Sequence, residues 1–118
     1  MTQLSRNFSR DEFECACCGE DTVDAELVTV LQDVRDYFRL PIKVTSGYRC
    51  FDHNRSIGGS KHSMHLKGRA ADIKVKDIAP SIVQTYLVNK YPDTYGIGLY
   101  KTFVHIDTRS ELARWAEV

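Results

Sequence analysis

Two stretches of the chain repeat apolar residues at the spacing of one helix face. Residues 24–38 carry apolar side chains every three or four positions, at Leu27, Leu31, Val34 and Phe38, and this period predicts an amphipathic helix. Pro41 follows this stretch and fits the end of a helix. Residues 80–90 predict a second amphipathic helix, with one side formed by Ile82, Val83, Tyr86 and Leu87.

Shorter stretches have the alternation or the β-branched residues that are typical of strands. They predict strands over 42–45, 69–75, 96–100 and 103–108, the last two forming a hairpin. Residues 110–116 are predicted to form a short final helix, with Trp115 packing back onto the domain. Near the start, Ser9 and Glu12 have the spacing of a capping box, which predicts a short capped turn pinned by Phe8 and Phe13.

These elements predict one α+β domain over residues 1–118. We expect a small, mostly antiparallel sheet with helices packed on one face and a long loop over the other. The loop is residues 46–68, which are rich in Gly, Ser, Asn, His and Arg and show almost no periodicity. A loop of this length in so short a chain is usually functional.

Composition excludes two classes of partner. Lys and Arg total 16 and Asp and Glu total 16, so no basic excess is available for nucleic acid. No apolar run approaches the roughly 20 residues of a membrane span. Residues 1–9 lack the apolar stretch of a signal peptide, so we expect synthesis in the cytoplasm and delivery by another route. A monomer is expected.

A metal site is indicated by His65, Asp72 and His105. His65 and Asp72 are seven residues apart, and Gly68 lets the chain turn sharply between them. Imidazole and carboxylate groups suit zinc, and a catalytic zinc needs three protein ligands plus an open position. A plainer interpretation stays open, in which Asp72 is a cross-strand partner and the other groups are surface or core residues.

The strand that carries His105 places a second acidic group beside it. Side chains alternate along a strand, so Val104 and Ile106 are expected to point into the core. His105 and Asp107 then share the opposite face, roughly 7 Å apart along the strand. Asp107 is a nearby carboxylate that need not bind the metal, although it could instead pair with Arg109.

The pattern Ser-x-His-x-x-Gly-x-Ala-x-Asp over Ser63 to Asp72, followed by the strand with His105, resembles the zinc D-alanyl-D-alanine carboxypeptidase family, peptidase M15. Further segments of the chain are similar to that family: residues 45–49, 53–54, 58–59 and 96–100. The likeness runs from about Phe8 to Trp115 and is strongest to short members from phages and prophages. It implies the fold shared by these peptidases and the amino-terminal domain of hedgehog proteins.

The resemblance implies a role for each matching residue. His65, Asp72 and His105 match the ligands of one catalytic zinc. Arg49 matches an arginine that holds the substrate's carboxylate or polarises its carbonyl, for which a structural ion pair is the alternative. Ser63 matches a serine that hydrogen-bonds substrate, for which a loop-stabilising hydroxyl is the alternative.

One position departs from the family. Better-known members have Glu or Asp three residues before the last histidine as general base, and here that residue is Thr102. Asp107 is the predicted replacement, and His62 is a weaker candidate. Without a base the domain would be an inactive zinc module.

The predicted function is zinc-dependent hydrolysis of stem peptides in bacterial peptidoglycan, by a carboxypeptidase or an endolysin-type endopeptidase. The alternative is an inactive zinc-containing module that binds the cell wall or a protein partner. Thr102 favours this alternative, whereas the unbroken motif from Ser63 to Asp72 favours the enzyme.

The cysteines permit several interpretations. Cys15, Cys17 and Cys18 are clustered near the start, and Cys50 lies downstream. A second, structural zinc at Cys15, Cys18 and Cys50, with His53 as a further ligand, is one possibility. A disulfide from Cys50 and unpaired thiols are the others.

Overall fold

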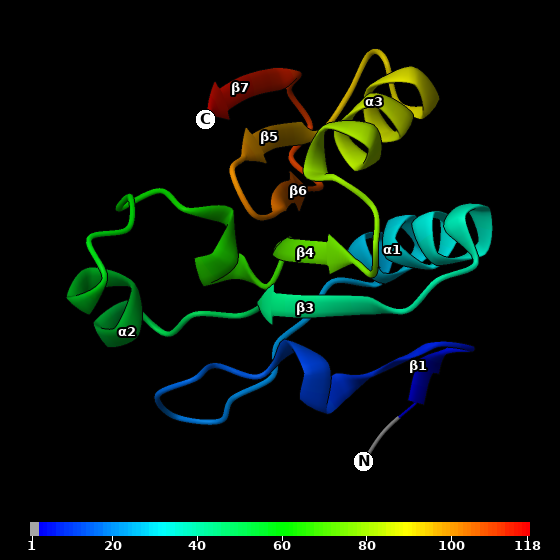
Figure 1. The fold of residues 1–118 in the computed structure, drawn as a ribbon. Coiled ribbons are helices and arrows are strands. Elements are labelled where there is room, and N and C mark those ends of the chain that lie inside the picture. The colour runs from blue at the N-terminus through cyan, green and yellow to red at the C-terminus, as the bar shows by residue number, and fades with distance from the viewer. Residues whose placement is uncertain (1–2) are drawn as a thin grey trace.

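A five-stranded sheet organises the computed structural model, which describes residues 3–118 (Figure 1). In spatial order its strands are β3 (Ile42–Ser46), β4 (Ala70–Val75), β6 (Val104–Asp107), β5 (Gly96–Tyr100) and β7 (Ala113–Glu117). Neighbouring strands are antiparallel except β5 and β7, which run parallel. The predicted α+β class with a mostly antiparallel sheet is confirmed.

Two helices supply most of the apolar cover for this sheet. Helix α1 spans Ala25–Phe38 and helix α3 spans Pro80–Lys90, close to the predicted ranges. Figure 1 shows α1 beside β4 and α3 beside β5. Strand residues of alternating position join the helices in one core, which includes Leu31, Leu87, Ala71, Ile73, Val104 and Ile106. Val104 and Ile106 therefore face the core, as their alternation predicts.

The amino-terminal segment packs against the same core. Strands β1 (Gln3–Ser5) and β2 (Phe8–Ser9) form a two-stranded sheet, and a 3-10 helix, η1, spans Arg10–Phe13. The backbone N–H of Ser9 donates to a carboxylate oxygen of Glu12 at 2.8 Å, which is half of the predicted capping box. Phe8 and Phe13 are buried, as expected.

The helix predicted over residues 110–116 is wrong, because residues 113–117 form β7. Strand β5 has an edge with free backbone groups, and β7 pairs with it from Gly96 to Tyr100. The indole Nε1 of Trp115 donates to the hydroxyl of Tyr100 at 2.9 Å, which holds the strand in this register. Tertiary pairing thus overrides the local helical tendency.

The predicted loop over residues 46–68 contains two short helices. Helix α2 spans Phe51–Ser56, and a second 3-10 helix, η2, spans Met64–Lys67. Each helix is too short to show an amphipathic period and so cannot be recognised from the sequence pattern. Within residues 3–118, no helix has the length and apolar character required to cross a bilayer.

Replacing Leu31 with Ala should destabilise the fold by about 2–5 kcal/mol, because the truncated side chain leaves a cavity in the core. Leu31 is 0% exposed, whereas Leu112 is 55% exposed, so Leu112→Ala serves as a matched control that should stay within about 0.5 kcal/mol of the parent. Urea unfolding of the three proteins measures the difference. Equal losses in both variants would contradict the assigned core.

Candidate metal centre

The sheet places the predicted ligands side by side through strand register. Asp72 of β4 lies directly opposite His105 of β6, and His105 lies opposite Gly98 of β5. Gly98 in turn pairs with Trp115 of β7. Residues that are directly opposite point to the same face, so Asp72, His105 and Trp115 form one row on the face away from the core.

Gly98 leaves the space that this row requires. A Cβ at Gly98 would lie 2.4 Å from the Trp115 indole, so any larger residue would push the ring away. With glycine there, the indole reaches the imidazole of His105, and the ring centroids are 5.1 Å apart. Trp115 therefore forms one wall beside His105.

His65 reaches the row from η2. The hydroxyl of Ser63 accepts a hydrogen bond from the His65 backbone N–H at 3.2 Å and caps the first turn. Gly68 ends η2 with φ of 68°, and a Cβ at this position would lie 2.6 Å from the carbonyl oxygen of Thr22. Glycine is therefore required at position 68, where the chain turns from His65 toward β4.

One ligand atom each of His65, Asp72 and His105 lies within 4.8 Å of the others, and all three residues are buried. Oδ1 of Asp72 is 3.3 Å from Nε2 of His65 and 3.0 Å from Nδ1 of His105. The structure therefore brings together all three residues that the sequence predicts as metal ligands. It also shows the cross-strand pairing of Asp72 that was the plainer interpretation.

The hydrogen bonds of His65 fix which nitrogen is free. Nδ1 lies 2.7 Å from the carbonyl oxygen of Gly47, which can only accept, so we assign the proton to Nδ1. The lone pair of Nε2 then faces the carboxylate of Asp72. Nε2 is buried and has no hydrogen-bond partner among the described residues. A buried acceptor of this kind is costly unless a cation or a donor completes it.

His105 repeats this arrangement. Its Nε2 lies 2.7 Å from Oδ2 of Asp107, a carboxylate that accepts the ring proton, and its Nδ1 faces Asp72. Two imidazole lone pairs and one carboxylate oxygen thus converge, with each ring oriented by an outer acceptor. This is the usual environment of histidines that bind zinc, and the three residues fit that metal.

The charges of the cluster are strongly coupled. Burial alone raises the pKa of Asp72, but contacts with His105 and His65 hold it well below its ordinary value. Burial lowers the pKa of His105, yet Asp107 and Asp72 together raise it. The carboxylate therefore stays ionised and requires positive charge beside it. Either a protonated imidazole or a divalent cation supplies that charge, and the lone pairs assigned above become ligands when the cation replaces the proton.

Asp107 lies beneath His105, and its side chain is fully buried. Its two oxygens accept hydrogen bonds from Nε and Nη2 of Arg109 at 2.8 and 2.7 Å, and Oδ1 accepts from the Gly96 backbone N–H at 3.2 Å. Although burial raises its pKa, His105 and Arg109 lower it overall. The pairing with Arg109 that the sequence left open is therefore present, alongside the contact with His105.

Arg49 approaches the cluster from the other side. Its Nη2 is 3.4 Å from Oδ2 of Asp72, its Nε donates to the Ser46 hydroxyl at 3.1 Å, and its Nη1 donates to Oδ1 of Asn54 at 3.3 Å. Asn54 is buried and also donates to the carbonyl of Ser60 at 2.8 Å. The guanidinium is thus held in place, and its ion pair is with a candidate ligand.

A cleft of about 550 Å³ opens above the cluster, and Arg49, Ser63, His65, Asp72 and His105 all line it. Other lining residues include Tyr100, Phe103, His62, Arg109, Trp115 and Glu117. Tyr100 and Phe103 stack with ring centroids 4.5 Å apart. Asp107 is not part of the lining. Among the described residues, Asp72 and Glu117 are the cleft's acidic side chains.

Sequence reasoning missed Asn54, Trp115 and Glu117 as parts of the site. The signal for Asn54 was its place in the segment 53–54 that is similar to the family. Trp115 and Glu117 reach the cleft because they lie on β7, whereas the sequence pattern predicted a helix there. Thr102, the residue at the position of the usual acid, is exposed in the turn between β5 and β6.

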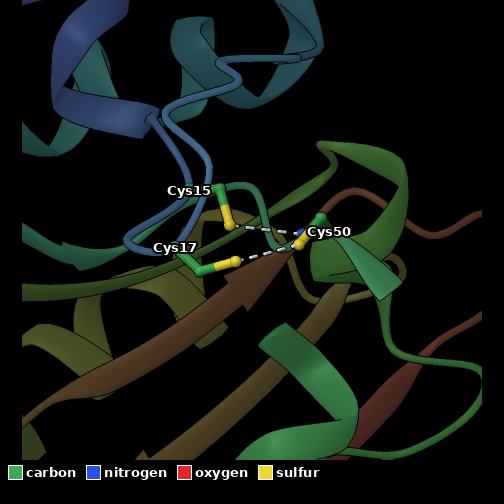
Figure 2. Close-up of side chains that lie close together, drawn as sticks. All are labelled: Cys15, Cys17 and Cys50. Atoms are coloured by element: carbon green, nitrogen blue, oxygen red, sulfur yellow. Dashed lines mark hydrogen bonds between the residues drawn. The ribbon is translucent and has the colours of Figure 1, made fainter. Parts of the chain in front are cut away.

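The cysteines form a second group. Sulfur atoms of Cys15, Cys17 and Cys50 lie within 4.8 Å of one another (Figure 2). The predicted zinc set named Cys15, Cys18 and Cys50, and the structure adds Cys17 to this group. Cys17 is brought in because its side chain turns toward Cys50, with the two sulfurs 3.5 Å apart. The four thiols are free.

Replacing His65 with Ala should remove one equivalent of bound zinc per chain, because the cluster then loses one of its three ligand atoms. His62 lines the same cleft but is exposed, so His62→Ala is the matched control and should keep its zinc. Elemental analysis after dialysis against trace zinc measures both. Unchanged zinc content in His65→Ala would refute the ligand assignment.

Comparison with known proteins places this geometry in a family. The Peptidase M15 family matches residues 6–107. Peptidoglycan L,D-endopeptidase MepK of Escherichia coli strain K12 is 39% identical over 77 residues, which cover 59% of this chain and 41% of that protein. The proteins of the same name from E. coli O157:H7 and Shigella flexneri match equally.

The aligned segment thus spans less than half the length of these curated relatives. The family match covers most of the chain, and it includes His65, Asp72 and His105. The predicted family is confirmed, whereas its D-alanyl-D-alanine carboxypeptidase branch stays a prediction. The chain belongs to the peptidase M15 family.

Proposed function

We propose that this domain is a zinc-dependent peptidase that hydrolyses peptide bonds in the stem peptides of bacterial peptidoglycan. The observation that carries the proposal is the convergence of His65 Nε2, His105 Nδ1 and Asp72 Oδ1 at the floor of an open cleft. Three protein ligands with access from solvent are the arrangement of a catalytic zinc, whereas a structural zinc is closed by four.

The residues around the cluster divide the remaining tasks. Zinc bound there would supply a Lewis acid and a water of lowered pKa. Arg49 holds a fixed positive charge at the cleft wall and is suited to a carboxylate or carbonyl oxygen of the substrate. Ser63 uses its lone pair to cap η2 and keeps its hydroxyl proton for donation into the cleft.

The bond that is cut is proposed from the relatives. Three proteins of similar sequence carry the name peptidoglycan L,D-endopeptidase, so we favour an endopeptidase that acts between an L- and a D-residue. The stacked rings of Tyr100 and Phe103 line the cleft and offer a flat apolar surface to a peptide chain. A carboxypeptidase is the competing assignment within the same chemistry.

Asp107 and Glu117 are the two candidates for the general base. Asp107 as the base stays a prediction, but its contacts favour a different task. Both oxygens of Asp107 accept hydrogen bonds from Arg109, and Oδ2 also accepts one from Nε2 of His105, the nitrogen that points away from Asp72. We therefore assign Asp107 to orienting His105, and Glu117 becomes the carboxylate that lines the cleft and can accept a proton there.

Incubation with muropeptides should give chelator-sensitive cleavage, read by mass spectrometry of the products. Cleavage at an internal L,D bond releases a fragment larger than one alanine, whereas a carboxypeptidase releases a single D-alanine. His65→Ala should be inactive and is the negative control. Intact muropeptides from several wall types, with zinc present in the protein, would instead favour the inactive module that Thr102 suggests.

Two conservative substitutions separate the roles of the acidic residues. Asp107→Asn should lower zinc affinity by about 10–100-fold, because an outer partner of a ligand is lost, and excess zinc should restore part of the activity. Glu117→Gln should keep its zinc and lower kcat by about 10²–10⁴-fold, the usual worth of a general base.

Zinc titration and steady-state kinetics of both variants provide the test. If Asp107→Asn binds zinc normally yet loses kcat, Asp107 is the base, as first predicted, and the orienting role is refuted. A fully active Glu117→Gln would remove Glu117 from the mechanism.

A further inference from the structure

A second group of potential ligands lies outside the cleft. Cys15 follows η1, Cys17 lies in the turn after it, and Cys50 precedes the first residue of α2 (Figure 2). Segments 33 residues apart in sequence thus meet at the Cys17 and Cys50 sulfurs, which are 3.5 Å apart. None of these residues contributes to the His65, Asp72 and His105 cluster.

The spacing of the sulfurs matches a tetrahedral metal site. Sulfurs bound to zinc at about 2.3 Å lie about 3.8 Å from one another in a tetrahedron. The observed separation of 3.5 Å for one pair, and the limit of 4.8 Å for all three, bracket that value. A disulfide would require the Cys17 and Cys50 sulfurs to approach to about 2.05 Å.

Backbone N–H groups point at these sulfurs. The N–H of Cys50 donates to the Cys15 sulfur at 3.4 Å, and the N–H of His53 donates to the Cys50 sulfur at 3.4 Å. Residues 15–20 form a tight turn, closed by the Cys15 N–H to the Glu20 carbonyl at 2.6 Å. Such donors stabilise sulfur in its negatively charged form, which is the form that binds metals.

The contacts within this group shift the pKa values of its thiols. Burial raises the pKa of Cys15, but backbone donors lower it to about 6, whereas contact with Cys50 raises the pKa of Cys17 to about 12. A backbone contact with Glu20 lowers the pKa of Cys18, but burial and the contacts with Cys15 and Cys50 raise it overall. A metal that binds this group would therefore displace the protons of Cys17 and Cys18.

We propose that Cys15, Cys17 and Cys50 bind a second zinc ion and that Cys18 completes its tetrahedral shell. Thiolate ligands select zinc and other soft metals, and a shell closed by four cysteines is structural. Binding releases the thiol protons and forms four zinc–sulfur bonds with no change of oxidation state.

This second site would fasten the amino-terminal turn to the candidate metal centre. Cys50 directly follows Arg49, whose backbone N–H donates to the His65 carbonyl at 3.1 Å. The preceding residue, Tyr48, donates its N–H to the Phe13 carbonyl at 2.8 Å. Zinc on the cysteines would therefore brace the backbone that carries Arg49, whatever reaction the cleft performs.

The test uses cobalt as a spectroscopic probe for zinc in the full chain, purified under reducing conditions. The background is the double variant His65→Ala with His105→Ala, which removes the ligands in the cleft. This protein should still bind one equivalent of cobalt and show the near-ultraviolet band of sulfur-to-metal charge transfer, which zinc should displace. The readout is independent of peptidase activity, so it can fail or succeed separately from the proposed function.

Cysteine variants in the same background identify the ligands. Cys17→Ser should lose the band and at least 10-fold in zinc affinity, and Cys17 is exposed, so the fold should survive. Cys18→Ser should weaken the band and the affinity if Cys18 is the fourth ligand. An unchanged spectrum in Cys18→Ser would overturn that part of the assignment.

Two results would overturn the site as a whole. One is a double variant that binds neither cobalt nor zinc although circular dichroism shows it folded. The other is a count of two reactive thiols in protein denatured without reductant, where four are expected. That count would show that two of the four cysteines form a disulfide, which leaves too few thiols for the proposed shell.

Discussion

The antiparallel register between β4 and β6 is the constraint on which the rest of the centre depends. It sets Asp72 opposite His105, while the residues on either side of each, such as Ala71 and Ile106, enter the core. A slip of one residue would turn every side chain of one strand to the other face. The same apolar packing that stabilises the sheet therefore also fixes which polar residues meet on its far side.

Placing these polar groups at a buried position has a cost, and the outer partners show how it is offset. The carbonyl of Gly47 and the carboxylate of Asp107 each take one ring proton and leave one lone pair per histidine directed at Asp72. Asp107 is itself neutralised by Arg109. Among residues 3–118, Nε2 of His65 is the buried side-chain atom left without a hydrogen-bond partner, and a cation between the three ligand atoms would complete it.

Elements with a clear period were predictable from the sequence, and so was the shared face of His105 and Asp107. Residues 113–117 were not, because their strand state depends on the free edge of β5, which no local pattern reveals. The proximity of His65, Asp72 and His105 was predictable from spacing and likeness, but the direction of each imidazole was not. The task of Asp107 depends on which nitrogen of His105 it contacts, and that detail appears only in three dimensions.

The two candidate metal sites differ in their ligand atoms and in their access to solvent. The cleft offers two nitrogens and one oxygen to a metal and leaves one side open to solvent, which permits exchange of water and substrate. The cysteines offer sulfur alone, from a tight turn and the start of α2, which favours a closed shell. Arg49 and Cys50 are adjacent in the chain. Zinc bound by the cysteines would therefore also hold the backbone of Arg49, which lines the cleft.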